Sequence, residues 1–182
     1  MKRKRIEEIV REFLVLIGEN PERKGLKQTP RLVAEFVEEI FLKKKEPKDI
    51  LKKYYAEHHE GIIGIKDIPF YSFCEHHLLP FFGKVGIAYI PKENIVAGFG
   101  DVVSLVQVLS RRLQLQERLT KDIADIFTQV ISPQGMLVKI EAEHLCVLMQ
   151  KEKKERVKTV TYAWRGVMKD EKIRKEALQL LK

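Results

Sequence analysis

Apolar residues near the start of the chain recur every three or four positions, which predicts amphipathic helices. The first helix is expected to end at Gly18. The second begins at the pair Thr29-Pro30, with Thr29 as the N-cap and Pro30 as the first helical residue. Their apolar faces consist of Ile6, Ile9, Val10, Phe13, Leu14 and Ile17 in the first helix and Val33, Phe36, Val37, Ile40 and Phe41 in the second.

The rest of the chain alternates between strand-like and helix-like patterns. Gly64 and Pro69 interrupt the first strand-like segment, which indicates an edge strand or a bent strand. In chain order, the patterns predict strands at 62–74 and 82–90, helices at 101–113 and 119–130, strands at 136–149 and 157–168, and a last helix from an Asp170 cap to Leu181.

The order of these elements indicates the fold class. Strands that follow one another in pairs favour an antiparallel sheet in an α+β domain over a doubly wound parallel sheet. We expect an N-terminal helical region over residues 1–60, followed by one compact domain over residues 61–182.

Composition places the protein among globular chains. Of its 182 residues, 45% are apolar and 33% are charged, which excludes intrinsic disorder. No apolar stretch approaches the roughly 20 residues of a membrane helix. The basic start resembles a signal peptide, but Glu7, Glu8, Arg11 and Glu12 interrupt any apolar segment, so we expect a cytoplasmic protein.

The net charge of +8 needs an explanation of its own. A basic surface can attract nucleic acid or an anionic substrate. The alternative is a surface rich in lysine and glutamate, as in heat-adapted proteins. Asparagine occurs only at Asn20 and Asn94 and no nucleic-acid-binding motif is present, so we favour the second interpretation and expect neither a nucleic-acid nor a membrane partner.

Cysteine and histidine gather in two short strings, Cys74-Glu75-His76-His77 and His144-Leu145-Cys146. Alternate residues of a strand share a face, so His144 and Cys146 are expected to point the same way. Neighbouring residues such as His76 and His77 diverge on a regular strand, so a bend is expected there. Two cysteines are too few for a disulfide scaffold, which makes a metal or catalytic use worth testing.

Thiolates and imidazoles together suit zinc. Cys74, His77 and Cys146 would supply three ligands and leave a fourth position open for water, as in catalytic rather than structural zinc sites. His76 and His144 would lie beside the metal and could transfer protons. The alternative is that the cysteines are buried apolar residues and the histidines are satisfied in the core; two combined strings favour the metal site.

At these strings the chain resembles the GTP cyclohydrolase I family, and the resemblance extends over nearly the whole length. Dense, ordered matches of this kind are specific for common ancestry. They lie at residues 18–26, Thr29-Pro30, 70–81, 88–91, 111–120, 141–146 and 158–161.

The resemblance implies a tunnelling fold, which is an antiparallel four-stranded sheet with a helix pair inserted after the second strand. It also implies a homodecamer in which strands of five subunits close a barrel, with active sites at subunit interfaces. Closure of the barrel removes exposed sheet edges, which is a physical reason for association.

The resemblance also implies a reaction. Water activated by zinc adds to the imidazole ring of a guanine nucleotide, formate leaves, and the product recloses as a pterin. Cys74, His77 and Cys146 resemble the zinc ligands, and His76 and His144 the proton-transferring histidines. Glu117, next to Gln116, resembles the buried carboxylate that binds the amino edge of the purine, so both are expected to bind substrate.

The chain departs from the family pattern at positions that mostly bind the triphosphate. Two lysines of the family are acids here and three arginines are neutral residues. The substituted positions are Leu32, Glu35, Gly100, Asp101, Ser104 and Gln150.

These features favour a zinc-dependent cyclohydrolase that acts on a guanine-type purine lacking the triphosphate. One alternative is an ordinary GTP cyclohydrolase I that makes 7,8-dihydroneopterin triphosphate through basic residues at shifted positions. Another is a catalytically silent homologue that acts as a binding subunit, although the intact cysteines and histidines argue against it. A nucleic-acid binder would explain the charge but none of these residues.

Overall fold

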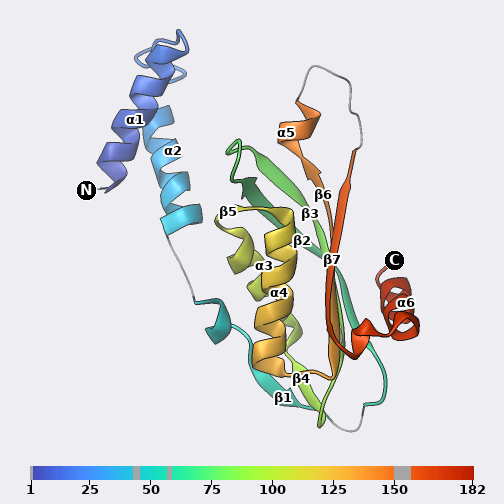
Figure 1. The fold of residues 1–182 in the computed structure, drawn as a ribbon. Coiled ribbons are helices and arrows are strands. Elements are labelled where there is room, and N and C mark those ends of the chain that lie inside the picture. The colour runs from blue at the N-terminus through green and yellow to red at the C-terminus, as the bar shows by residue number, and fades with distance from the viewer. Residues whose placement is uncertain (1, 43–45, 57–58, 150–156) are drawn as a thin grey trace. The chain divides into compact units, whose positions relative to one another are not determined.

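The structure is a computed structural model, and it describes residues 2–42, 46–56, 59–149 and 157–182. The chain divides into two compact units, Met1–Lys44 and Lys45–Lys182 (Figure 1). Each unit is described by itself below.

The first unit is helical, as predicted. It contains α1 (Lys2–Leu16), α2 (Thr29–Val37) and a π-helical turn at Glu38–Leu42. Gly18 follows α1 with a φ of +85°, a conformation that glycine adopts without strain. The predicted cap of α2 is wrong: Gln28 is the N-cap, and Thr29 and Pro30 are the first helical residues. The reason is that turns precede the helix, with the Thr29 N–H already bonded to the Leu26 carbonyl.

The second unit begins earlier than residue 60, where the sequence placed the boundary. A short 3-10 turn at Pro47–Asp49 precedes strand β1 (Lys53–Tyr55). Strand β1 pairs with β4 (Ile95–Ala97), which lies much later in the chain. Because of this pairing, residues 53–55 belong to the second unit. The sequence did not predict either short strand.

The main sheet has the strand order β5-β2-β3-β6-β7. Its four long strands, β2 (Ile63–Cys74), β3 (Pro80–Ile90), β6 (Gly135–His144) and β7 (Thr159–Gly166), pair antiparallel, which confirms the predicted α+β sheet. Strand β5 (Leu113–Gln114) was not predicted and runs parallel to the end of β2. A register shift between Ile65 and Ile68 bends β2, as Gly64 and Pro69 suggested.

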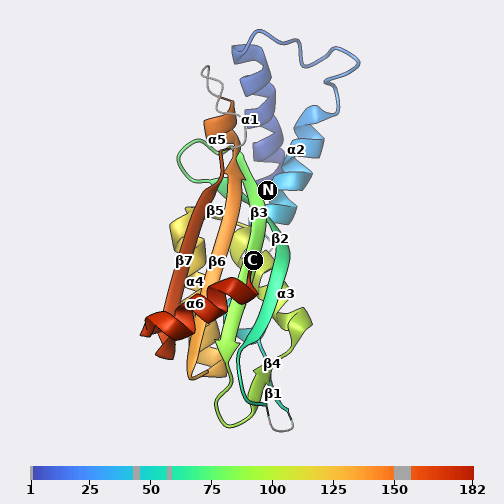
Figure 2. The same ribbon diagram turned by 90° about the vertical axis from the view of Figure 1, so that its right-hand side faces the viewer.

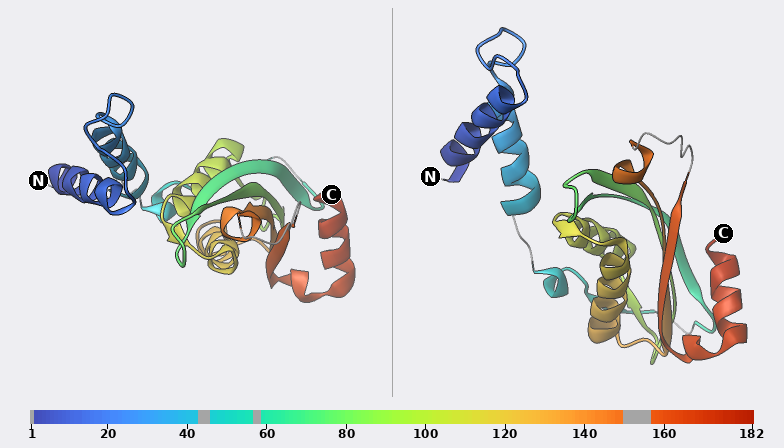
Figure 3. Two further views of the ribbon diagram at one scale, coloured as in Figure 1. Left: turned by 90° about the horizontal axis from the view of Figure 1, so that it is seen from above. Right: turned by 45° about the horizontal axis from the view of Figure 1, so that its top comes forward.

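Helices cover both faces of this sheet (Figures 1 and 2). Helices α3 (Phe99–Ser110) and α4 (Gln116–Ile131) pack on one face, and α6 (Glu171–Leu180) packs on the other (Figure 3). The larger core lies under α3 and α4 because their apolar stripes face the sheet; its members include Phe70, Phe81, Val85, Leu105, Leu119, Ile123, Phe127, Val138 and Ile140. The smaller core under α6 consists of Ala88, Leu137, Met168, Ala177 and Leu181.

Strand β6 is shorter than the sequence predicted. It ends at His144, and residues Leu145–Leu148 form a helical turn, α5. The reason is the pairing partner: Phe81, opposite His144, forms the last pair of the β3–β6 ladder. The prediction that His144 and Cys146 lie on one face of one strand is therefore wrong.

Gly83 lies where the backbones of β3 and β6 approach each other closely. A Cβ built there would lie against the carbonyl oxygen of Glu141 and 2.7 Å from the Cα of Ala142, both in the backbone of β6. We expect Gly83→Ala to lower the free energy of unfolding by about 1–3 kcal/mol through overpacking. Denaturant unfolding at a fixed protein concentration measures this.

The matched control is Gly100→Ala in α3, where an added Cβ meets nothing within 4 Å. This change should leave stability unchanged or raise it slightly, since alanine favours helix. Equal effects of the two substitutions would contradict the close approach of the strands.

Candidate metal centre and catalytic histidines

A tight turn between β2 and β3 brings the first string together. The Leu78 N–H bonds to the Cys74 carbonyl, and the Cys74 N–H bonds to the Leu79 carbonyl, each at 2.9 Å. Leu78 adopts a left-handed φ of 57°. This turn is the predicted bend, and it places the Nδ1 atom of His77 3.9 Å from the Cys74 sulfur.

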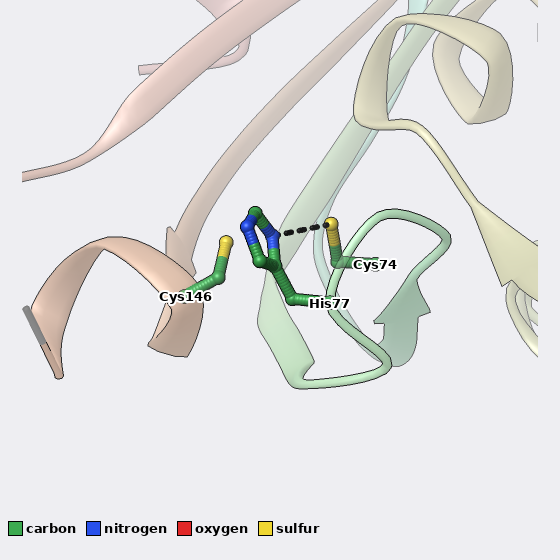
Figure 4. Close-up of side chains that lie close together, drawn as sticks. All are labelled: Cys74, His77 and Cys146. Carbon is green, nitrogen blue, oxygen red and sulfur yellow. Dashed lines mark hydrogen bonds between the residues drawn. The ribbon is translucent and has the colours of Figure 1, made fainter.

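Helix α5 supplies the third member of the cluster. It follows His144, which pairs with Phe81 just after the β2–β3 turn, so Cys146 is delivered to the same end of the sheet. The ligand atoms of Cys74, His77 and Cys146 all lie within 4.8 Å of one another (Figure 4). Both cysteines are free thiols. The structure thus brings together the three residues that the sequence named as metal ligands.

The donor set and spacing fit a metal such as zinc. Tetrahedral zinc with ordinary Zn–S and Zn–N bonds holds its ligand atoms about 3.5–3.8 Å apart, so the side chains need to close in only slightly. Cys74 is buried, Cys146 is partly buried and His77 is exposed. The cluster therefore faces solvent on one side, as a site with an open coordination position requires.

The protonation of Cys146 follows from its surroundings. Burial, and then the neighbouring Cys74, raise the pKa of the Cys146 thiol. The thiol consequently stays protonated near neutral pH without a metal, and a bound cation would take the place of its proton.

His144 is held on two sides. Its ring stacks on Phe81 with centroids 4.6 Å apart and planes 4° from parallel. Its Nε2 atom lies 2.8 Å from the Oε1 atom of Gln116. Burial lowers the pKa of His144, and the charge of Glu117 opposes that shift. The imidazole is therefore neutral near pH 7.

The other predicted residues surround this centre. The ring centroid of His76 lies 6.2 Å from that of His77, and both rings are exposed. Glu117 is exposed in this chain and lines a groove of about 700 Å³ between α4 and β7. Gln116 is only 2% exposed, and its side chain is occupied by hydrogen bonds within the protein.

The substituted positions are distributed over both units. Leu32 and Glu35 lie on α2, and Glu35 pairs with Arg31 at 2.9 Å and also with Arg3. Positions 100, 101 and 104 lie in the first half of α3. The Oδ2 atom of Asp101 is buried and, among the described residues, has no hydrogen-bond partner. Gln150 lies outside the described residues.

Two supporting residues escaped the sequence analysis. Phe81 lies in the matched segment 70–81, but the sequence did not predict that it stacks on His144. Thr161 was likewise part of a motif, although its hydroxyl accepts a hydrogen bond from Gln116. The signal that could have found them is the strand register, which pairs Phe81 with His144 and Thr161 with Ile140.

Comparison with known proteins decides the family. A family model described as GTP cyclohydrolase I matches residues 6–182. The chain belongs to the GTP cyclohydrolase I family. This assignment confirms the resemblance drawn from the sequence motifs and makes the chain a hydrolase that acts on cyclic amidines.

Relatives of the GTP cyclohydrolase I family match over almost their whole length. A GTP cyclohydrolase 1 of Clostridioides difficile is 49% identical over 182 residues, covering 98% of this chain and 96% of the relative. One of Caldanaerobacter subterraneus is 48% identical over 181 residues, covering 98% and 96%. One of Streptococcus pyogenes is 44% identical over 183 residues, covering 100% and 94%.

A solved structure supports the tunnelling fold of the GTP cyclohydrolase I family. The apo form of a QueF-like archaeosine synthase aligns with a TM-score of 0.50 at 17% identity, covering 60% of this chain and 97% of that one. At this identity the likeness concerns the fold alone. Among the residues that the structure describes, no helix is long and apolar enough to cross a membrane.

Proposed function

We propose that this chain catalyses the GTP cyclohydrolase I reaction, which opens the imidazole ring of GTP, releases formate and recloses the product as 7,8-dihydroneopterin triphosphate. One observation carries the proposal: a Cys–His–Cys cluster with His144 and Glu117 nearby, in a chain 44–49% identical to enzymes of that name. The presence of all three donors in one cluster argues against a silent binding subunit.

Zinc is the proposed metal, with Cys74, His77 and Cys146 as its ligands. Two sulfurs and one imidazole suit zinc better than hard cations, which prefer oxygen. When bound, zinc supplies Lewis acidity that makes water nucleophilic near neutral pH.

His144, His76 and Glu117 are the proposed groups that act on the substrate. His144 is neutral and partly buried, so it can accept a proton near the metal centre. His76 is exposed on the β2–β3 turn and can exchange protons with solvent. Glu117 lies at the start of α4, where its carboxylate can accept hydrogen bonds from the two N–H groups of a guanine edge.

The relatives named GTP cyclohydrolase 1 support GTP rather than a shortened substrate, and the contacts of the substituted acids are compatible with it. As isolated carboxylates in place of the family's lysines, Glu35 and Asp101 would repel a triphosphate. In the structure, Glu35 pairs with Arg3 and Arg31, and Arg3 also pairs with Glu7 and Glu38. One oxygen of Asp101 is turned into the protein at the start of α3, where a negative charge is favourable. Both observations weaken the expected repulsion.

Self-association into a homodecamer remains part of the proposal. Among the described residues, β7 pairs only with β6, and β2 pairs with β5 only at Phe73 and Cys74. Both edges of the sheet therefore offer unpaired backbone groups, and joining β7 of one copy to β2 of the next would satisfy them.

The metal prediction concerns Cys146→Ser. The purified parent protein should hold about one zinc per chain, and the variant should lose it because a three-ligand site cannot spare a ligand. Elemental analysis after dialysis measures both. Zinc retained at full stoichiometry by the variant would remove Cys146 from the ligand set.

The substrate prediction compares GTP, GMP and guanosine. We expect the parent protein to show its highest kcat/KM with GTP, followed through formate release and the ultraviolet spectrum. A preference for guanosine or GMP would overturn the proposed substrate and favour a site without triphosphate binding.

Glu117→Ala provides the matched test of base recognition. It should raise KM for GTP while leaving bound zinc unchanged, because the carboxylate is not part of the metal cluster. A variant that captures GTP as well as the parent would exclude the proposed contact.

The assembly prediction concerns mass in solution. A chain of 21.3 kDa should sediment as a much larger species, consistent with ten copies. A fully active monomer at micromolar concentration would contradict closure through the sheet edges.

A further inference from the structure

The His144 ring needs more than stacking to present a defined atom. Phe81 lies parallel to the ring and fixes its plane. A parallel neighbour is nearly indifferent to a half-turn of the imidazole about its Cβ–Cγ bond, which keeps the ring plane but exchanges each nitrogen with a carbon. Only a directional contact can select one orientation, and the contact present is between Nε2 and Oε1 of Gln116 at 2.8 Å.

The orientation of the Gln116 amide is itself determined by its surroundings. Its Nε2 atom lies 3.2 Å from the Ile140 carbonyl oxygen, 3.1 Å from the Thr159 carbonyl oxygen and 3.0 Å from the Thr161 hydroxyl. Carbonyl oxygens can only accept hydrogen bonds. A flipped amide would place its oxygen against both carbonyls, so Nε2 must face the sheet and Oε1 must face His144.

Two hydroxyl groups complete a network in which the donor and the acceptor of each hydrogen bond can be assigned. The Thr120 hydroxyl lies 2.7 Å from the Gln116 backbone carbonyl, which can only accept, so Thr120 donates there. Its oxygen then accepts from the Thr161 hydroxyl, also 2.7 Å away. Thr161 in turn accepts from the Gln116 amide. Each donor in this partly buried network faces an acceptor, and the three acceptors around the Gln116 Nε2 atom share its two hydrogens, which restricts the arrangement.

We infer that Gln116 is a positioning residue that fixes the His144 ring with Nε2–H as the donor to its Oε1 atom, so that Nδ1 is the acceptor nitrogen of the neutral imidazole. The geometry follows from the amide: Oε1 can only accept, so the Nε2 atom of His144 must carry a hydrogen. The inference replaces the expectation that the Gln116 side chain contacts substrate, because all its hydrogen-bonding atoms are already used inside the protein.

Its catalytic consequence rests on the proposed function. A proton acceptor must be held in place before substrate arrives, and loss of a supporting contact of this kind typically costs 10–100-fold in activity. Because Gln116 acts through His144, its removal should lower kcat rather than weaken substrate binding.

The kinetic test uses Gln116→Met, which keeps the length of the side chain and removes its hydrogen bonds. In the zinc-loaded protein we expect kcat for GTP to fall about 10–100-fold, with KM changed less than about threefold. In a His144→Ala background, the same substitution should cause no further loss, since the two residues act as one unit. A raised KM with normal kcat, or losses that multiply in the double variant, would overturn the inference.

Substitutions of Thr161 provide a second test in case the Gln116 variant does not fold. Thr161→Val removes the hydroxyl that holds the amide and should lower kcat severalfold, and Thr161→Ser should restore it. Thr128→Val is the matched control on α4, because its hydroxyl is buried and has no hydrogen-bond partner in the described structure. Equal losses in the two valine variants would assign the effect to packing and overturn the inference.

Ring nitrogen shifts of ¹⁵N-histidine-labelled, zinc-loaded protein provide a readout that does not depend on turnover. The His144 signals, assigned by their loss in His144→Ala, should show a protonated Nε2 and an unprotonated Nδ1 at one fixed neutral pH. Gln116→Met should give a mixture of both forms, and an unchanged spectrum would overturn the inference. If the parent fails to turn over GTP, the proposed function fails, but this spectrum still tests the position of the ring.

Discussion

The register of β3 against β6 determines where the candidate metal ligands and His144 meet. The β2–β3 turn carries Cys74 and His77, and the end of β6 carries His144 and leads into Cys146. These segments meet because Phe81 pairs with His144 at the last position of the ladder. A slip by one residue would turn His144 to the other face of the sheet and move Cys146 away from the metal cluster. Two features hold this register in place: the close approach at Gly83, and the alternation of buried and partly buried side chains in the later part of β6.

The same register explains why Gln116, the first residue of α4, can reach the His144 ring. Gln116 bonds to the Ile140 carbonyl of β6 and to Thr159 and Thr161 of β7, which lie side by side in the ladder. Burial of an amide costs free energy unless all its atoms are paired, and here they are. The network thus ties the helix to the sheet and orients His144 through a single side chain, so packing and chemistry depend on the same contacts.

The sequence predicted the fold class and the candidate metal ligands because both carry local signals. Helical periodicity located α1, α4 and α6, and Asp170 caps α6 as expected, accepting from the N–H groups of Lys172 and Ile173. The end of β6, the pairing of β1 with β4 and the bonds of Gln116 depend instead on contacts between distant segments. Residue patterns carry no information on where a ladder loses its partner, so the position of Cys146 on α5 could not be predicted.

Electrostatic interactions show most clearly why residue type alone is insufficient to predict whether a site binds phosphate. Two unit charges 4 Å apart interact by about 4 kcal/mol at an effective dielectric constant of 20, so an acid in place of a lysine suggests strong repulsion of a phosphate. That estimate assumes an isolated charge. Glu35 pairs with Arg3 and Arg31, and Arg3 also pairs with Glu7 and Glu38, so the local charge is set by five groups together and not by Glu35 alone. The free energy of binding depends on such local sums, and these are set by which side chains the helices bring together rather than by the identity of one position.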